Sequence, residues 1–161
     1  LTNKIFIIMA VIHGNAVGIF IDDTDTGASA SKLVACATSA TFSLNNATFE
    51  ASCKSSTTAG ALDDASVRHL GAGQQSWSMG VDGLVDLAAS HADEEGYVDL
   101  VQLALDRTQI TVVFSDGTAG NKQYSGSGYI SFVEATASVD DFVTYSCSIE
   151  GTGTLAPSTV V

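Results

Sequence analysis

Apolar and polar residues alternate strictly along two segments of the chain, and this alternation limits the folds that the chain can adopt. In the first segment Trp77, Met79 and Val81 alternate with serine, glycine and aspartate. In the second, residues 143–150, an apolar side chain occupies every other position. Successive side chains of a β-strand point to opposite faces of a sheet, so a period of two predicts strands with one buried face.

Other segments predict further strands by their apolar runs and by the turn formers that bound them. Residues 17–21 and 108–114 are short apolar runs, and residues 32–44 place Phe42 and Leu44 on one face. We expect Asn45-Asn46 to be a hairpin turn, followed by an alternating strand through Phe49. The last strands are expected to form a hairpin, with residues 129–137 and 142–149 flanking a turn at 138–141.

One segment, residues 93–107, has the spacing of an amphipathic helix. Tyr97, Leu100, Val101 and Ala104 fall at i, i+3, i+4 and i+7. The acidic run 93–95 would lie in the first turn, where the helix dipole favours negative charge. The sequence therefore predicts a helix packed on a sheet.

The fold class predicted is mainly β, an antiparallel β-sandwich or barrel with one flanking helix. Residues 55–73 lack apolar periodicity and are expected to be a long inter-strand loop, a length that often has a function. We find no repeat or linker and expect a single domain over residues 1–161. Residues 1–8 are expected to be an N-terminal extension and residues 156–161 a C-terminal tail.

Charge excludes one class of function. The chain has 6 basic and 18 acidic residues, for a net charge of -12. Tight binding to nucleic acid relies on lysine and arginine contacts to phosphate, which this composition does not offer. The apolar run at residues 5–12 is far too short to span a bilayer, so no membrane partner is expected.

Catalytic and metal-binding motifs are weak. Asp25-Thr26-Gly27 has the spelling of an aspartic protease turn, but no apolar strand directly precedes it, and a solvated turn is the simpler interpretation. A calcium loop beginning at Asp22 would need an acidic residue where Leu33 stands. The three histidines lie far apart in the sequence. We therefore expect no catalytic residue, no metal ion and no cofactor.

The remaining candidates also favour structural roles. Cys36, Cys53 and Cys147 cannot all pair within one chain, and the last two lie on the apolar phase of expected strands, where a thiol is usually inert. Two glycine pairs, 126 with 128 and 151 with 153, are expected to mark turns or bulges. The aromatic residues of the expected strands are interpreted as core rather than as a platform for sugars or bases; they are Trp77, Tyr129, Phe132, Phe142 and Tyr145.

Two stretches resemble the major tail tube proteins of long-tailed bacteriophages. Residues 70–85 resemble that family's glycine-then-Ser-Trp-Ser strand. Residues 124–132 and 144–155 resemble its C-terminal hairpin, which closes in Gly-x-Gly. The order of the remaining elements agrees from about residue 9 to residue 155, whereas the first eight residues, the turn at 22–25 and the end of the chain depart from the pattern.

The resemblance implies a structural protein of the virion tail, assembled in the bacterial host cytoplasm. In such a family subunits form hexameric rings, the rings stack, and inner strands join into a β-barrel around a lumen that conducts double-stranded DNA without binding it specifically. Implied partners are further copies of the chain and other tail proteins at the tube ends. The alternatives are an aspartic protease using Asp25 and a monomeric surface-adhesion β module.

On this interpretation two sets of residues are candidate sites. The long loop would reach the adjoining ring, through the contact residues Ser55, Thr57, Asp63, Asp64 and Arg68. Four acids that interrupt or oppose apolar phases are expected to face the lumen and repel DNA: Glu50, Asp82, Glu134 and Glu150.

Overall fold

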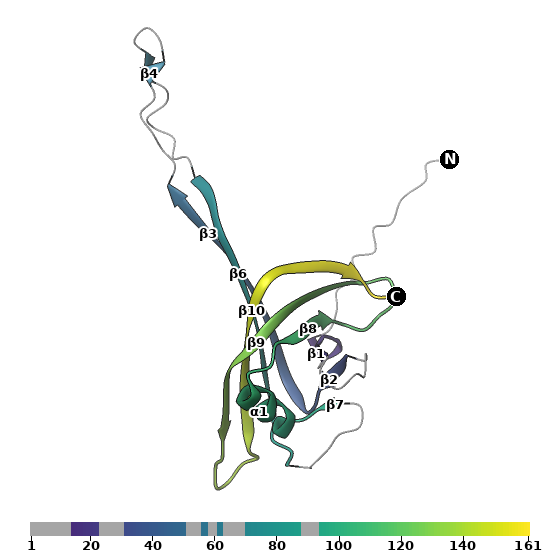
Figure 1. The fold of residues 1–161 in the computed structure, drawn as a ribbon. Coiled ribbons are helices and arrows are strands. Elements are labelled where there is room, and N and C mark those ends of the chain that lie inside the picture. The colour runs from purple at the N-terminus through teal and green to yellow at the C-terminus, as the bar shows by residue number, and fades with distance from the viewer. Residues whose placement is uncertain (1–13, 23–30, 51–55, 58–60, 63–69, 88–93) are drawn as a thin grey trace, which may run out of the picture.

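The computed structural model describes residues 14–22, 31–50, 56–57, 61–62, 70–87 and 94–161, and most of them belong to one eight-stranded β-sheet (Figure 1). The strand order is β3-β6-β10-β9-β8-β1-β2-β7. The strands are β1 (Gly18–Asp22), β2 (Lys32–Val34), β3 (Ala37–Glu50), β6 (Leu70–Leu84), β7 (Glu94–Glu95), β8 (Ile110–Ser115), β9 (Lys122–Thr136) and β10 (Thr144–Thr159). A short 3-10 helix, η1 (Gly14–Ala16), precedes β1.

Neighbouring strands of this sheet are antiparallel, apart from the parallel pair of β2 and β7. The mainly β class with one helix agrees with the sequence analysis. In the described part of the chain the terminal strands β3 and β7 do not pair with each other, so the sheet stays open. A closed barrel or a two-sheet sandwich is therefore not confirmed for a single subunit.

The strands β9 and β10 at the centre of the sheet pair with each other, and β9 also pairs with β8 over part of its length. β9 pairs with β10 over nearly its whole length, but with β8 only through residues 124–128. Residues 129–136 of β9 thus have a hydrogen-bonding partner on one side only among the described strands. The end of β10, expected to be a tail, continues this ladder, with Ala156 opposite Ser125 and Thr159 opposite Lys122.

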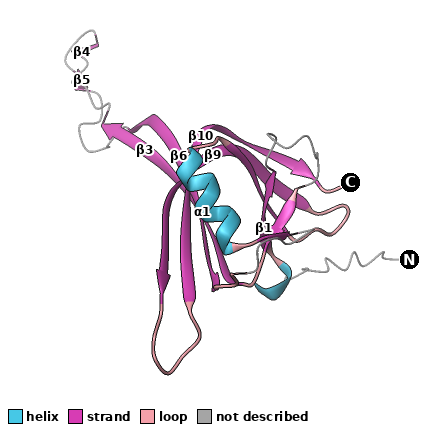
Figure 2. Ribbon diagram, turned by 60° about the horizontal axis from the view of Figure 1, so that its bottom comes forward, coloured by secondary structure: helices cyan, strands magenta, loops and turns pink. Residues whose placement is uncertain are grey.

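The hairpin expected at Asn45-Asn46 is wrong, because β3 runs straight through both residues to Glu50. β6 begins at Leu70, four residues inside the expected loop, and pairs with β3 along its length. Residues 45–50 and 70–76 form a two-stranded arm that protrudes from the body in Figures 1 and 2. Beyond it, β4 (Ser56–Thr57) pairs with β5 (Ala61–Leu62).

The helix α1 spans Tyr97–Asp106 and begins four residues later than the expected start at residue 93. Glu94 and Glu95 belong to β7 instead, and the Asp99 carboxylate accepts a hydrogen bond from the Gly96 backbone N–H at 3.0 Å. The helix ends at Arg107, whose φ of 53° is left-handed. No helix in the described segments is long and apolar enough to cross a bilayer.

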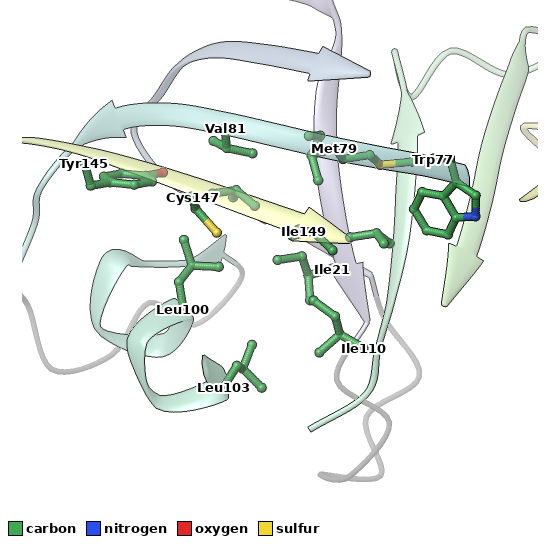
Figure 3. Close-up of a cluster of buried hydrophobic side chains, with 13 residues drawn as sticks. Ile21, Trp77, Met79, Val81, Leu100, Leu103, Ile110, Tyr145, Cys147 and Ile149 are labelled. Carbon is green, nitrogen blue, oxygen red and sulfur yellow. The ribbon is translucent and has the colours of Figure 1, made fainter. Parts of the chain in front are cut away.

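The core lies between α1 and one face of the sheet, as Figure 3 shows for its central residues. Leu100 and Leu103 of the helix point toward the strands, where the buried Cys147 and Ile149 of β10 alternate with half-buried serines. In the second half of β6, Trp77, Met79 and Val81 are buried in the same alternating way. Thirteen buried residues form the cluster: Ile19, Ile21, Val34, Trp77, Met79, Val81, Leu100, Leu103, Ile110, Val112, Tyr145, Cys147 and Ile149.

Trp77 is the largest of these side chains, and two glycines make room for it. A Cβ atom placed on Gly126 or on Gly151 would overlap the indole ring. The indole N–H donates a hydrogen bond to the carbonyl oxygen of Gly153, at 3.2 Å. Gly153 itself adopts a φ of 73° near the irregular stretch of β10 between Thr152 and Ala156. Gly126, Gly151 and the tryptophan strand are therefore one packing unit. Gly128 lies instead against Ile149 and Glu150, and of the four glycines only Gly153 lies within the irregular stretch of β10.

We predict that Gly151→Ala destabilises the fold by about 1–3 kcal/mol, because the added methyl group overpacks the site of Trp77. Unfolding in denaturant, followed by the fluorescence of the chain's single tryptophan, measures this change. Gly14→Ala is the matched control, since its Cβ would meet no atom within 4 Å. Equal stability of the two variants would contradict the packing described here.

Candidate assembly surface

The face of the sheet that points away from the core is polar over the four strands β3, β6, β10 and β9. Register pairs align its side chains in rows across the strands. One row contains Ser39, Asp82, Ser146 and Glu134. Residues directly opposite one another share a face, so these side chains project from the same side of the sheet. We call this surface the polar face.

Two further rows extend the polar face along the strands. They are Thr41, Gly80, Ser148 and Phe132, and Ser43, Ser78, Glu150 and Tyr129. Short hydroxyl side chains thus predominate, and carboxylates supply the charge. None of the described basic residues lies in these rows. Lys32 pairs with Glu95 at 3.1 Å, Arg107 ends α1, and Lys122 donates a hydrogen bond to Thr159 at 2.9 Å.

Asp82 is a carboxylate of the polar face whose two oxygens both accept hydrogen bonds from serine hydroxyls. The Ser146 hydroxyl donates to Oδ1 and the Ser39 hydroxyl to Oδ2, each at 2.7 Å. The hydrogen bond from Ser146, followed by that from Ser39, lowers the pKa of Asp82 below its ordinary value, against a smaller opposing effect of desolvation. The ionised side chain therefore ties β3, β6 and β10 together.

The other expected lumen acids divide into two groups. Glu134 and Glu150 are exposed on the polar face, as a lining role requires. Glu50 instead ends β3 on the arm, where it pairs with Leu70. Leu70 lies 12 residues along β6 from Asp82, or roughly 40 Å at the usual rise of a strand. The structure brings three of the four acids together and leaves Glu50 apart.

Most of the expected inter-ring contact residues fall outside the described part of the chain. This holds for Ser55, Asp63, Asp64 and Arg68, and also for the protease-like Asp25 and for Cys53. Thr57 is described in its backbone only, as a residue of β4 paired with Ala61. The contact role of these residues stays a prediction.

Three aromatic residues expected in the core are exposed instead. Trp77 and Tyr145 are in the core as expected, but Phe142 lies in the exposed β9–β10 loop, and Tyr129 and Phe132 project from the polar face. Tyr129 and Phe132 are 45% and 50% exposed and lie on the part of β9 that lacks a partner on one side. The alternation of side chains in the sequence did not indicate their exposure, because a period of two does not show which strand lies at a free edge of the sheet.

The chemistry of the described residues gives no catalytic constellation. A cavity of about 320 Å³ on the polar face is lined by Asp82, Glu134, Tyr145 and neighbouring hydroxyls, and one of about 500 Å³ beside the β10 bulge is lined by uncharged residues. Burial raises the pKa of the Cys147 thiol to about 12, so this cysteine stays protonated and inert. The described residues contain no group of three or more His, Cys, Asp or Glu that could hold a metal ion.

Comparisons with known proteins agree on one class. A family model described as phage tail tube protein matches residues 13–156. A tail of an empty gene transfer agent particle, with C6 symmetry, has a TM-score of 0.71 at 20% identity, covering 92% of this chain and all of that one. A native gene transfer agent virion gives 0.69 at 17% identity over 92% of this chain and all of that one. The SPP1 tail tube gives 0.64 at 17% identity over 92% of this chain and 80% of its own. No curated protein matches the sequence.

We predict that removing the serine hydroxyls raises the pKa of Asp82. Ser146→Ala should raise it more than Ser39→Ala, because the Ser146 hydrogen bond has the larger effect. The unfolded pKa of aspartate is about 3.9. A carboxylate whose pKa is lower in the folded state stabilises the fold at pH values above about 3.9, and this stabilisation is lost as the pH falls through the folded pKa. Titration of Asp82 by NMR measures the shift, and a wild-type pKa at or above 3.9 would contradict the geometry.

Proposed function

This chain belongs to the phage tail tube protein family and is a structural protein of the virion tail, and we propose from this premise that its copies close into hexameric rings which stack into a DNA-conducting tube. The observation that supports the proposal most directly is the polar face, where hydroxyls and carboxylates predominate, with Tyr129 and Phe132 at one edge, and where no described basic side chain lies. A hexameric arrangement is consistent with the C6 symmetry of one similar tail.

Ring closure would use the two free edges of the four-stranded segment. Among the described strands β3 pairs only with β6, and residues 129–136 of β9 pair only with β10. Because the four strands alternate in direction, β9 of one subunit would meet β3 of the next in antiparallel orientation. Adding strands across such edges satisfies exposed backbone groups that are a liability in a monomer. The barrel expected from the sequence would then form between subunits.

In this ring the polar face lines the lumen, with Asp82, Glu134 and Glu150 as its carboxylates. Phosphates passing through the tube would meet negative charge at a distance comparable with the Debye length, about 8–10 Å in physiological salt, and would not adhere. The chain acts as a passive conduit with no catalytic step, and other tail proteins would bind at the tube ends.

We predict that purified protein forms hollow tubes with six-fold rings in electron micrographs. Amide hydrogen exchange tests the edges directly. Amides of residues 37–44 in β3 and 129–136 in β9 should become protected on assembly, because half of them lack partners in the monomer. Amides of residues 144–150 in β10 are the internal control, since this segment already has a partner on each side. Persistent monomers, or unchanged exchange at both edges within tubes, would overturn the proposal.

We further predict that charge reversal on the polar face makes the tube bind DNA. Tubes of a Glu134→Lys, Glu150→Lys variant should retain double-stranded DNA at low salt and release it as salt rises, whereas wild-type tubes should not retain it. The matched comparison for charge is Glu134→Lys alone against Asp106→Lys on the exposed side of α1, since each variant reverses one carboxylate. Equal retention by the control variant would place the acids elsewhere than in the lumen.

A further inference from the structure

The tilt of barrel strands determines which residues of neighbouring subunits meet when a ring closes. Strands tilt by about 35–45° from the barrel axis, so a row drawn at right angles to them shifts along the axis as it goes round. Neighbouring strands are about 4.8 Å apart, and the segment β3, β6, β10 and β9 therefore spans about 19 Å. At this tilt the row reaches the next subunit displaced by about 13–19 Å along its strands, which is about four to six residues.

The described strands give the direction and the parity of this displacement. With no displacement, the row that runs from Ser39 to Glu134 would meet Ser39 of the next subunit. A displacement toward lower numbers would place Glu134 opposite Ala35, which is buried and donates its backbone N–H to the Glu95 carbonyl oxygen at 2.8 Å. The displacement therefore goes toward higher numbers, and only an even number of residues keeps the polar face continuous.

Of the two even values in this range, the smaller one fits the shape of the subunit. A displacement of about four residues brings Glu134 opposite Ser43, and one of about six brings it opposite Asn45, where the arm begins. The arm protrudes from the body (Figures 1 and 2), so the smaller displacement keeps more of the junction within the body of the sheet. It corresponds to a strand tilt of about 35°.

The same displacement gives the β9–β10 loop an apolar neighbour. Residues 137–140 would lie alongside residues 37–40 of the next subunit. Val139 and Phe142 of this loop are 100% and 77% exposed in the single chain. Leu84, which is also exposed, ends β6 beside the start of β3, so the next subunit offers an apolar side chain where the loop arrives.

The surroundings of Glu134 would then repeat those of Asp82. Asp82 lies in its row between Ser39 and Ser146, and the hydroxyls of both donate to its carboxylate at 2.7 Å. Glu134 lies opposite Ser146 on one side, and its other side is the free edge of β9. Ser43 of the next subunit would supply the second hydroxyl, and no two charges would face each other across the junction.

We propose that Glu134 of one subunit lies directly opposite Ser43 of the next, in an antiparallel pairing of β9 with β3. This inference rests on the proposed ring and specifies the register in which the ring closes. It places one carboxylate between two serine-bearing strands at every junction between subunits.

Disulfide cross-linking measures this register. A Glu134→Cys, Ser43→Cys protein should give a ladder of linked chains that ends at the hexamer, because directly opposed residues have Cβ atoms about 4.5–5.5 Å apart. Cys36→Ser and Cys53→Ser remove the other thiols except that of Cys147, which is buried. Within one chain the two new cysteines are three strand spacings apart, about 14 Å, so they cannot link to each other.

Glu134→Cys combined with Thr41→Cys or with Asn45→Cys gives the matched controls, since both positions lie on the polar face of the same strand. These pairs should give at least about fivefold less linked product, because diagonal neighbours are about 7–8 Å apart. A mixture of the single variants Glu134→Cys and Ser43→Cys should give linked dimers, and neither variant alone should link. The fluorescence of Trp77, which lies in the core, checks that each variant is folded.

Each outcome decides between the claims. More linked product through Thr41 or Asn45 than through Ser43, a ladder that runs past the hexamer, or intact rings in which Ser43 does not link would overturn this register and leave the ring proposal standing. Failure of the wild-type protein to form rings would overturn both.

Discussion

The alternation of side chains along β6 and β10 is the constraint on which the rest of the molecule depends. The same two strands bury Trp77, Met79 and Cys147 on one face and present Asp82 and Ser146 on the other. A shift of one residue in their register would send the core side chains to the polar face and the carboxylates into the core. The packing of the core and the chemistry of the polar face are therefore set by a single register.

Trp77 makes that register hard to change. Its ring occupies space left by Gly126 on β9 and Gly151 on β10, and its N–H finds an acceptor in the backbone of Gly153. These contacts join β6, β9 and β10 at one point, and Trp77 is next in β6 to Ser76, where the arm begins. The arm can extend without a core of its own because its base is anchored here.

The spacing of apolar residues predicted the strands and the helix whose burial repeats along the chain. The period of two located β6 and β10, and the helical spacing located α1. Of the four expected helix residues only Leu100 is fully buried, and Leu103, which was not expected, is buried beside it. The Asn45-Asn46 turn was predicted from residues that favour turns, but pairing with β6 along the whole arm overrides that preference. The helix start was misplaced because β7 uses Glu94 and Glu95, and pairing with β2 is a long-range contact that spacing does not report.

The same limit applies to the candidate site. Opposition to an apolar phase selected Asp82, Glu134 and Glu150, which lie on one face of the sheet, but it could not show that the strand carrying Glu50 continues onto an arm. Nor could it reveal that Asp82 is held by Ser146 and Ser39, since these residues are 64 and 43 positions away in the chain.

This difference among the carboxylates bears on how a wall of like charge is tolerated. Repulsion between acids on neighbouring strands opposes their close approach, and a hydrogen-bonded carboxylate offsets part of that cost by binding its neighbours. Asp82 of β6 lies between Ser39 of β3 and Ser146 of β10, so its charge links these strands rather than separating them. The exposed Glu134 and Glu150 have longer side chains that can remain hydrated. A surface of hydroxyls with a few charges placed in this way can be negative and still be held together by its own polar groups.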